Sequence, residues 1–231
     1  IRRVLFFILL IGISLLYLLV TFRGLDSAKG MDQAQLAREI ARNEGFTTKV
    51  LRPVSIWQNG EVRSGQPIIK DANRDTYHAP LHPILLSWAL KFVDGDDADK
   101  WRMTEKDTVY KLDRVVAATS VICFLIAIGV NYLLISRIFD GRIGGVTALL
   151  MLLCDLNWKF SQTGLPQMFM LLLFSCACFF AYRAVETTEE GRIAIGPALI
   201  AAAFLGLLAS LVSGLSHLLV TTFVLIRRLR L

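Results

Sequence analysis

The long polar segment of this chain, residues 23–112, contains no cysteine. All four cysteines lie inside or at the edge of apolar stretches: Cys123, Cys154, Cys176 and Cys178. The sequence therefore predicts neither a disulfide framework nor a Cys-x-x-Cys metal site. Two helical cysteines separated by one residue, as at Cys176 and Cys178, also point to different faces.

A concentrated basic segment is missing as well, although the formal net charge is +6. Residues 23–112 carry 14 Lys or Arg and 13 Asp or Glu, so this segment is nearly neutral. The rest of the chain carries 11 basic and 6 acidic residues, and its basic residues lie mostly at the ends of apolar stretches. That distribution is typical of membrane topology and argues against nucleic-acid binding.

Apolar residues make up 55% of the chain. The stretch 4–22 holds 19 residues without a charge, which is enough to cross a hydrocarbon core of about 30 Å. This stretch is longer than the apolar core of a cleavable signal peptide, and no cleavage site of small residues follows it, so we predict an uncleaved helix. Five more candidate spans follow at 115–135, 143–156, 166–182, 195–212 and 215–226.

The chain therefore divides into a first transmembrane helix (1–22), a polar loop (23–112) and further apolar stretches (113–231). We predict an all-α integral membrane protein with about six transmembrane helices. Nine basic residues fall on one side of the predicted spans, which places the amino terminus in the cytoplasm and the loop outside. Because the chain starts at Ile1 and ends in basic residues directly behind an apolar stretch, we expect a piece of a longer protein.

The loop contains two amphipathic pieces of its own. Residues 31–43 predict a helix with small and apolar residues on one side and Gly45 as its stop. Residues 82–93 form a 12-residue apolar stretch that is too short to span a membrane. We expect this second piece to be an interfacial or re-entrant helix.

Asp32 is the first candidate functional residue, about ten residues beyond the first apolar stretch. Because Gln35 follows three residues later, ahead of an apolar periodic segment, Asp32 fits a capping box. Helix capping alone would explain it, and a functional role is the alternative.

His78 and His82 form a second candidate, interleaved with Pro80 and Pro83. Two histidines four residues apart bind zinc on a helix, but the prolines favour an extended backbone and oppose that geometry. Pro83 also suits the first turn of a helix. A divalent metal site therefore stays open beside a structural role.

Polar residues also occur where predicted spans meet the outer surface. Ionisable groups at membrane depth are costly, and they usually line a cavity or pair with one another. Location at the water interface explains some of them equally well, and hydrogen bonding to a neighbouring helix explains His217. The candidates are Asp113, Arg114, Asp155, Lys159, Gln167 and His217.

In this order, these elements resemble the amino-terminal half of a GT-C fold glycosyltransferase. That group includes protein O-mannosyltransferases and the bacterial lipid A aminoarabinose transferase. The matching elements are Asp32 ahead of Gln35-Leu36-Ala37, the Pro-Pro-Leu-like Ala79-Pro80-Leu81, Arg114 at the second span, and Arg137-Ile138-Phe139-Asp140-Gly141 after it.

The resemblance implies inverting transfer of a sugar from a polyprenyl-phosphate donor to a glycan, lipid or protein acceptor at the outer face of a bacterial inner membrane. It implies that Asp32 is the catalytic base and that Arg114 and His217 stabilise the phosphate leaving group. The remaining substrate-binding candidates are His78, His82, Asp155, Lys159 and Gln167.

One residue departs from the family pattern. Gln167 stands where many members carry a second acidic residue, so Asp155 is the nearby substitute, and a divalent metal stays an open question. The departure favours an alternative function, a non-catalytic membrane scaffold that binds a partner through the loop. A transporter fits less well, because the second to fifth apolar stretches hold almost no ionisable residues.

Overall fold

The structure is a computed structural model. It describes residues 2–50, 62–63, 66–67, 73–75, 77–94, 97, 102–103, 109–189 and 195–213. His217 and the predicted span 215–226 lie outside these residues. The described part is helical, as predicted, except for two short antiparallel ladders. These pair β1 (Thr47–Thr48) with β4 (Asn73–Arg74) and β2 (Val62–Arg63) with β3 (Gln66–Pro67).

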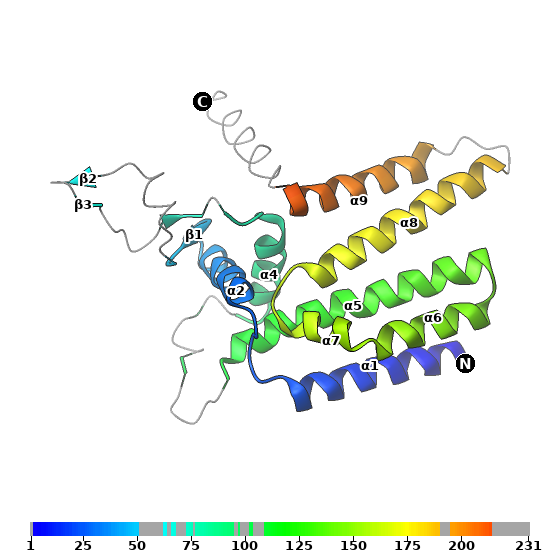
Figure 1. The fold of residues 1–231 in the computed structure, drawn as a ribbon, viewed down its shortest axis with the longest axis horizontal. Coiled ribbons are helices and arrows are strands. Elements are labelled where there is room, and N and C mark those ends of the chain that lie inside the picture. The colour runs from blue at the N-terminus through cyan, green and yellow to red at the C-terminus, as the bar shows by residue number, and fades with distance from the viewer. Residues whose placement is uncertain are drawn as a thin grey trace.

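The apolar helices form an elongated bundle (Figure 1): α1 (Arg2–Thr21), α5 (Lys111–Ile138), α6 (Gly141–Leu153), α8 (Gln167–Glu189) and α9 (Ile195–Ser213). Buried residues such as Phe124, Ile128 and Trp158 form the core of this bundle. Between α5 and α8, the Asn131 amide donates a hydrogen bond of 2.7 Å to the Ser175 hydroxyl. Both side chains also donate to backbone carbonyls of their own helices, so this bond links α5 to α8 through polar groups that are already paired.

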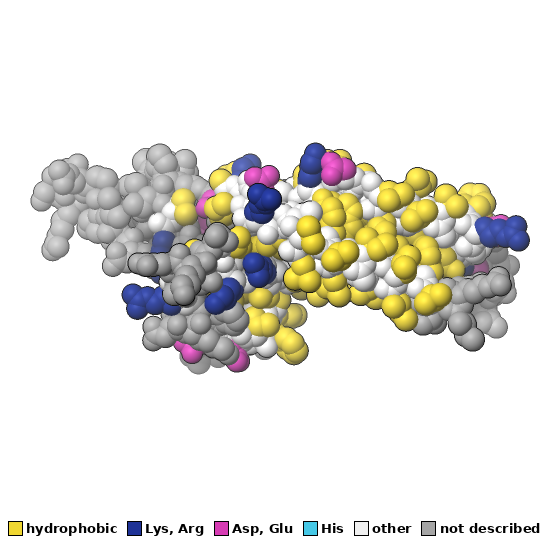
Figure 2. All heavy atoms as spheres, turned by 90° about the horizontal axis from the view of Figure 1, so that it is seen from below, with side chains coloured by type: hydrophobic (Ala, Val, Ile, Leu, Met, Phe, Trp, Pro, Cys, Tyr) yellow, Lys and Arg dark blue, Asp and Glu magenta, His cyan; other side chains and the backbone are white. Residues whose placement is uncertain are grey.

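By length and composition, α5 and α8 are two helices that can cross a membrane, and a bent helix pair would make a third. α1 and α9 are also apolar but shorter over the residues searched. On the face shown in Figure 2, hydrophobic side chains cover much of the middle of the bundle, whereas charged side chains lie mainly toward its ends. The described residues thus have two or three candidate spans rather than the six predicted.

The predicted span 143–156 is wrong as one continuous helix. The helix is interrupted at Cys154, and the axis of the next helix, α7 (Asp155–Gln162), is bent by 55° from that of α6. The break removes helical partners from the last carbonyls of α6, and side chains of α7 replace them. Trp158 Nε1 donates to the Leu152 carbonyl at 2.6 Å, and Asn157 Nδ2 donates to the Met151 carbonyl at 3.0 Å.

Two loop helices, α2 (Ala28–Ala41) and α4 (Leu81–Phe92), lie together at one end of the bundle (Figure 1). They run in the same direction, because Gln33 bonds His82 near their starts and Asn43 bonds Lys91 near their ends. α4 matches the predicted apolar piece. α2 begins three residues earlier than predicted and ends before Asn43, whose positive φ of 63° terminates it ahead of Gly45.

α2 is fixed to the bundle at both ends. At its far end, Arg38 pairs with Asp113 at 3.2 Å and lies over the Tyr110 ring. At its near end, Gly30 packs directly against the turn between α7 and α8. A Cβ at Gly30 would overlap the backbone carbonyl of Thr163. Only glycine therefore allows this approach.

Gly30→Ala should lower the free energy of unfolding by about 1–3 kcal/mol, because the added methyl has no space against fixed backbone. The matched control is Gly12→Ala on α1, where a Cβ meets nothing within 4 Å. Thermal unfolding in detergent measures both variants. Equal midpoints for the two variants would contradict the close approach of α2 to the turn.

Candidate functional site

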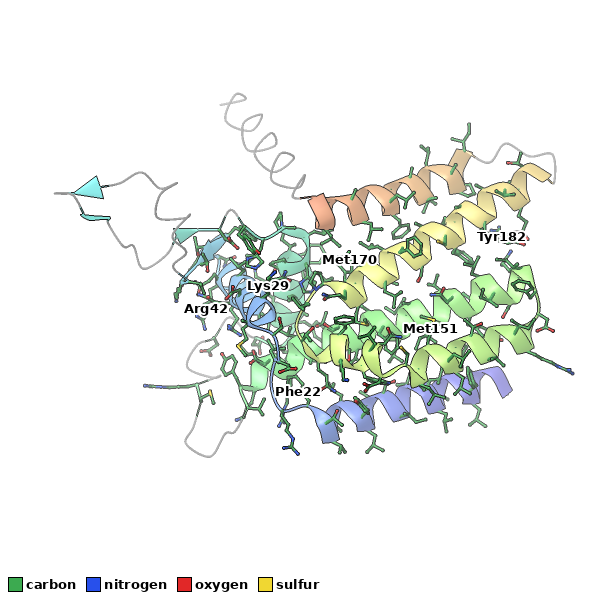
Figure 3. All side chains as sticks on the ribbon, in the orientation of Figure 1. Phe22, Lys29, Arg42, Met151, Met170 and Tyr182 are labelled. Carbon is green, nitrogen blue, oxygen red and sulfur yellow. The ribbon has the colours of Figure 1, made fainter. Side chains whose placement is uncertain are left out.

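A polar pocket of about 360 Å³ lies where the starts of α2 and α4 meet the start of α8 and the end of α9. Lys29 lies at the end of α2 that faces this junction (Figure 3). Leu165, Pro166 and Leu211 supply part of the apolar wall. The polar lining residues are Lys29, Gln33, Tyr77, His78, His82 and Gln167.

His78 is held by a neighbouring carboxylate. Its Nδ1 lies 2.6 Å from Oδ2 of Asp75, and both residues are buried. The other oxygen of Asp75 accepts the backbone N–H of Tyr77 at 2.9 Å, which closes an Asx-type turn. Because a carboxylate oxygen accepts, Nδ1 carries the proton and Nε2 presents a lone pair in the neutral ring. Nε2 is buried and has no hydrogen-bond partner in the structure's described part.

His82 lies in the first turn of α4 and donates from Nδ1 to Oε1 of Gln33. Only 3% of its surface is exposed. Burial lowers the pKa of His82 to about 3, because the charged ring would lose its hydration. This histidine is therefore neutral at pH 7.

Gln167 begins α8 at the opposite wall of the pocket. Its Oε1 is a second buried acceptor without a partner among the described residues. The two histidines and this glutamine were all predicted as site residues, and the fold brings them together from segments about 90 residues apart.

Asp32 does not have the predicted capping role. Ser27 occupies the N-cap position of α2, so Asp32 lies inside the helix and the capping-box interpretation is wrong. Asp32 is half-buried and is not among the lining residues. It follows Lys29 by three residues, and helical positions three apart are neighbours on the helix surface, so Asp32 is next to a residue that lines the pocket.

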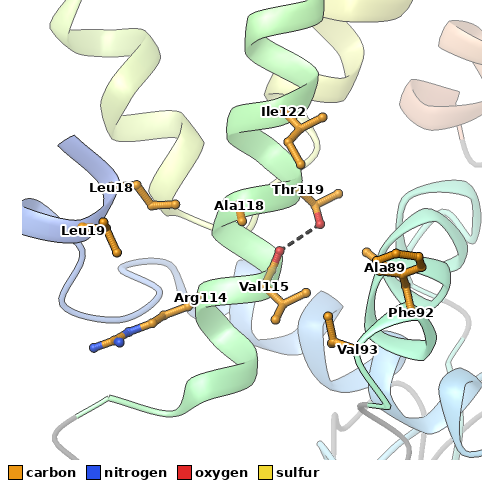
Figure 4. Close-up of a pocket in the computed structure, with 10 residues that line it drawn as sticks. All are labelled: Leu18, Leu19, Ala89, Phe92, Val93, Arg114, Val115, Ala118, Thr119 and Ile122. Carbon is orange, nitrogen blue, oxygen red and sulfur yellow. Dashed lines mark hydrogen bonds between the residues drawn. The ribbon is translucent and has the colours of Figure 1, made fainter. Parts of the chain in front are cut away.

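Arg114 belongs to a different feature. It lies at one end of an apolar groove of about 430 Å³, formed by α1, α4 and α5 (Figure 4). Its guanidinium extends away from α4 (Figure 4). The groove contacts the far end of α4 at Phe92, whereas the pocket contacts His82. These positions are about 15 Å apart along the helix, so Arg114 does not reach the pocket's lining.

Asp155 and Lys159 lie on α7 and pair with each other at 2.8 Å. Their side chains are 68% and 71% exposed. Neither lines the polar pocket, so the structure does not bring Asp155 in as a substitute for the missing acid at Gln167.

The sequence interpretation missed four residues that shape the pocket: Lys29, Gln33, Asp75 and Tyr77. Lys29 precedes the predicted start of the helix and becomes helical only because α2 begins at Ala28, whereas Gln33 lies within the predicted helix and had no motif to mark it. Asp75 follows a short strand and had no motif to mark it. Among the described residues, no group of three or more His, Cys, Asp or Glu is placed to hold a metal ion.

Comparisons with protein-family models, with curated protein sequences and with solved structures find no match to this chain. The chemistry of the pocket therefore rests on its residues. It offers unpaired acceptors on His78 and Gln167 and a cation on Lys29. This combination suits a small polar ligand that carries hydroxyl groups and a negative charge.

Stability should fall as the pH drops below about 6.5, the pKa of an unfolded histidine. Because the folded pKa of His82 is lowered to about 3, the unfolded state binds the proton first. Each pH unit between these values then costs about 1.4 kcal/mol. Thermal midpoints of wild type and His82→Gln between pH 7.5 and 5 measure this. Parallel slopes would show that His82 is not buried in its neutral form.

Proposed function

We propose that this protein is a GT-C type glycosyltransferase that moves a sugar from a polyprenyl-phosphate donor to an acceptor at the outer membrane surface. The observation that carries the proposal is the polar pocket at the junction of the loop helices with the apolar bundle. A substrate with a lipid tail and a sugar head needs such a junction, where a polar cavity adjoins membrane-facing helices.

The proposal includes about six membrane spans, with α1, the joined α6 and α7, and α9 among them. The amino terminus is cytoplasmic, and α2 and α4 lie outside, in a bacterial inner membrane. Trp88 and Phe92 of α4 are 69% and 91% exposed. Exposed aromatic side chains of this kind suit the interfacial region of a bilayer.

In this mechanism, Asp32 accepts the proton of the acceptor hydroxyl or amine as it attacks the anomeric carbon. The bond between that carbon and the phosphate oxygen breaks, and the polyprenyl phosphate leaves as an anion. Lys29 supplies positive charge at the pocket, one helical turn from Asp32. This gives Lys29 the role that the family resemblance implied for Arg114 and His217. The apolar groove beside Arg114 instead suits part of the lipid chain.

A non-catalytic scaffold is the second candidate. It is favoured by Gln167 and by the absence of any Asp or Glu among the described lining residues of the pocket. Under this alternative, the loop helices bind a partner protein and Asp32 has no chemical role.

Asp32→Asn in the full-length protein should slow release of polyprenyl phosphate from its donor by at least about a hundredfold, because the general base is lost. Purified protein in detergent is tested against a panel of polyprenyl-phosphate sugars. The matched control is Asp140→Asn, because Asp140 caps α6 and asparagine caps a helix equally well.

Equal release by wild type and Asp32→Asn would remove Asp32 from the chemistry. No release by folded wild type from any donor would favour the scaffold.

A further inference from the structure

The pocket leaves two hydrogen-bond acceptors unused. Nε2 of His78 and Oε1 of Gln167 are both buried without a partner among the described residues. Buried polar atoms are nearly always paired in proteins, so two such atoms on one cavity call for a hydrogen-bonding partner within it. They come from different parts of the fold, the turn before α4 and the start of α8, and they line the same cavity.

The hydrogen bonds around the two histidines fix what the pocket offers. His78 donates from Nδ1 to Asp75, so its Nε2 accepts in the neutral ring. His82 donates from Nδ1 to Gln33, so its second nitrogen is also an acceptor. With both rings neutral, a ligand at these atoms donates hydrogen bonds, as hydroxyl groups do. A phosphate dianion carries only acceptors and does not complement these atoms, whereas Lys29 in the same lining suits an anionic group.

We propose that this pocket is a sugar-binding subsite, in which ligand hydroxyls donate to Nε2 of His78 and to Oε1 of Gln167. The inference rests on the proposed function and names the place of the sugar within it. The cavity of about 360 Å³ falls within the usual range for small-ligand pockets, about 300–1,000 Å³. Gln167 is then a sugar ligand rather than a replaced catalytic acid.

Two substitutions remove one acceptor each and keep local packing. In His78→Asn, the amide nitrogen can still donate to Asp75, but the acceptor at the position of Nε2 is lost. In Gln167→Leu, a side chain of similar size lacks the amide. The matched control is Gln162→Leu, the same change five residues earlier, at a side chain that bonds Thr21 and does not line the pocket.

The experiment measures binding of free mannose, glucose, galactose and arabinose to the full-length protein in detergent by saturation-transfer NMR. Wild type and Gln162→Leu should bind at least one of these sugars. His78→Asn and Gln167→Leu should each weaken that binding by about tenfold, the effect of one lost hydrogen bond. Thermal unfolding establishes that each variant is folded.

Deoxy analogues of the bound sugar separate a lost hydrogen bond from general damage. The analogue lacking the hydroxyl that meets His78 should bind wild type about tenfold more weakly than the parent sugar. It should bind His78→Asn as well as the parent sugar does, because the partner is already absent.

Three results would overturn the inference: no binding of any of the sugars, unchanged binding by either folded variant, or binding of inorganic phosphate that both variants abolish. These results are distinct from failure of the proposed function. A protein that binds sugar here but releases no polyprenyl phosphate keeps the subsite and loses the transferase.

Discussion

The close approach of α2 to the turn between α7 and α8 is the constraint on which the polar pocket depends. Gly30 has no side chain, so the helix can lie against the Thr163 carbonyl. Lys29 and Gln33, on either side of Gly30, are thereby brought opposite Leu165 and the start of α8. On the other side of the contact, Gly164 adopts a positive φ of 73° and lies close to the Leu25 side chain, so the turn between α7 and α8 can pack against the segment before α2.

α4 connects the two concave features of the molecule. Its first turn contributes His82 to the polar pocket, and its last turn contributes Phe92 to the apolar groove. Between them, Leu86 and Leu90 pack with Ala34, Ala37 and Ala41 of α2 in one buried cluster. Small residues on α2 let the two helix axes come close, so the helix pair can hold both features in fixed positions.

Apolar length and periodicity were sufficient to predict α1, α5, α8, α9 and the apolar α4, because each reflects a local run of residues. The break at Cys154 was not predicted, because Leu156 extends the apolar stretch past Asp155 and the bonds that stabilise the break come from Asn157 and Trp158, just beyond that stretch. The start of α2 was predicted too late, because Asp32 and Gln35 have the spacing of a capping box although both lie inside the helix.

The sequence identified several residues of the site, but it did not show which of the candidates lie together in space. The histidines and Gln167 stood out as polar residues near apolar segments, and they do line one pocket. The local sequence pattern could not show that Arg114 lines the apolar groove. Nor could it show that Asp155 pairs with Lys159 on an exposed face. Asp75 was missed because its importance comes only from the bond to His78, which the turn geometry creates.

The most direct test is a structure of the full-length protein with a bound polyprenyl-phosphate sugar. The sugar ring should lie within hydrogen-bond distance of His78 and Gln167, with the phosphate beside Lys29. A sugar bound instead at the groove near Arg114, or a donor that does not bind, would contradict this arrangement.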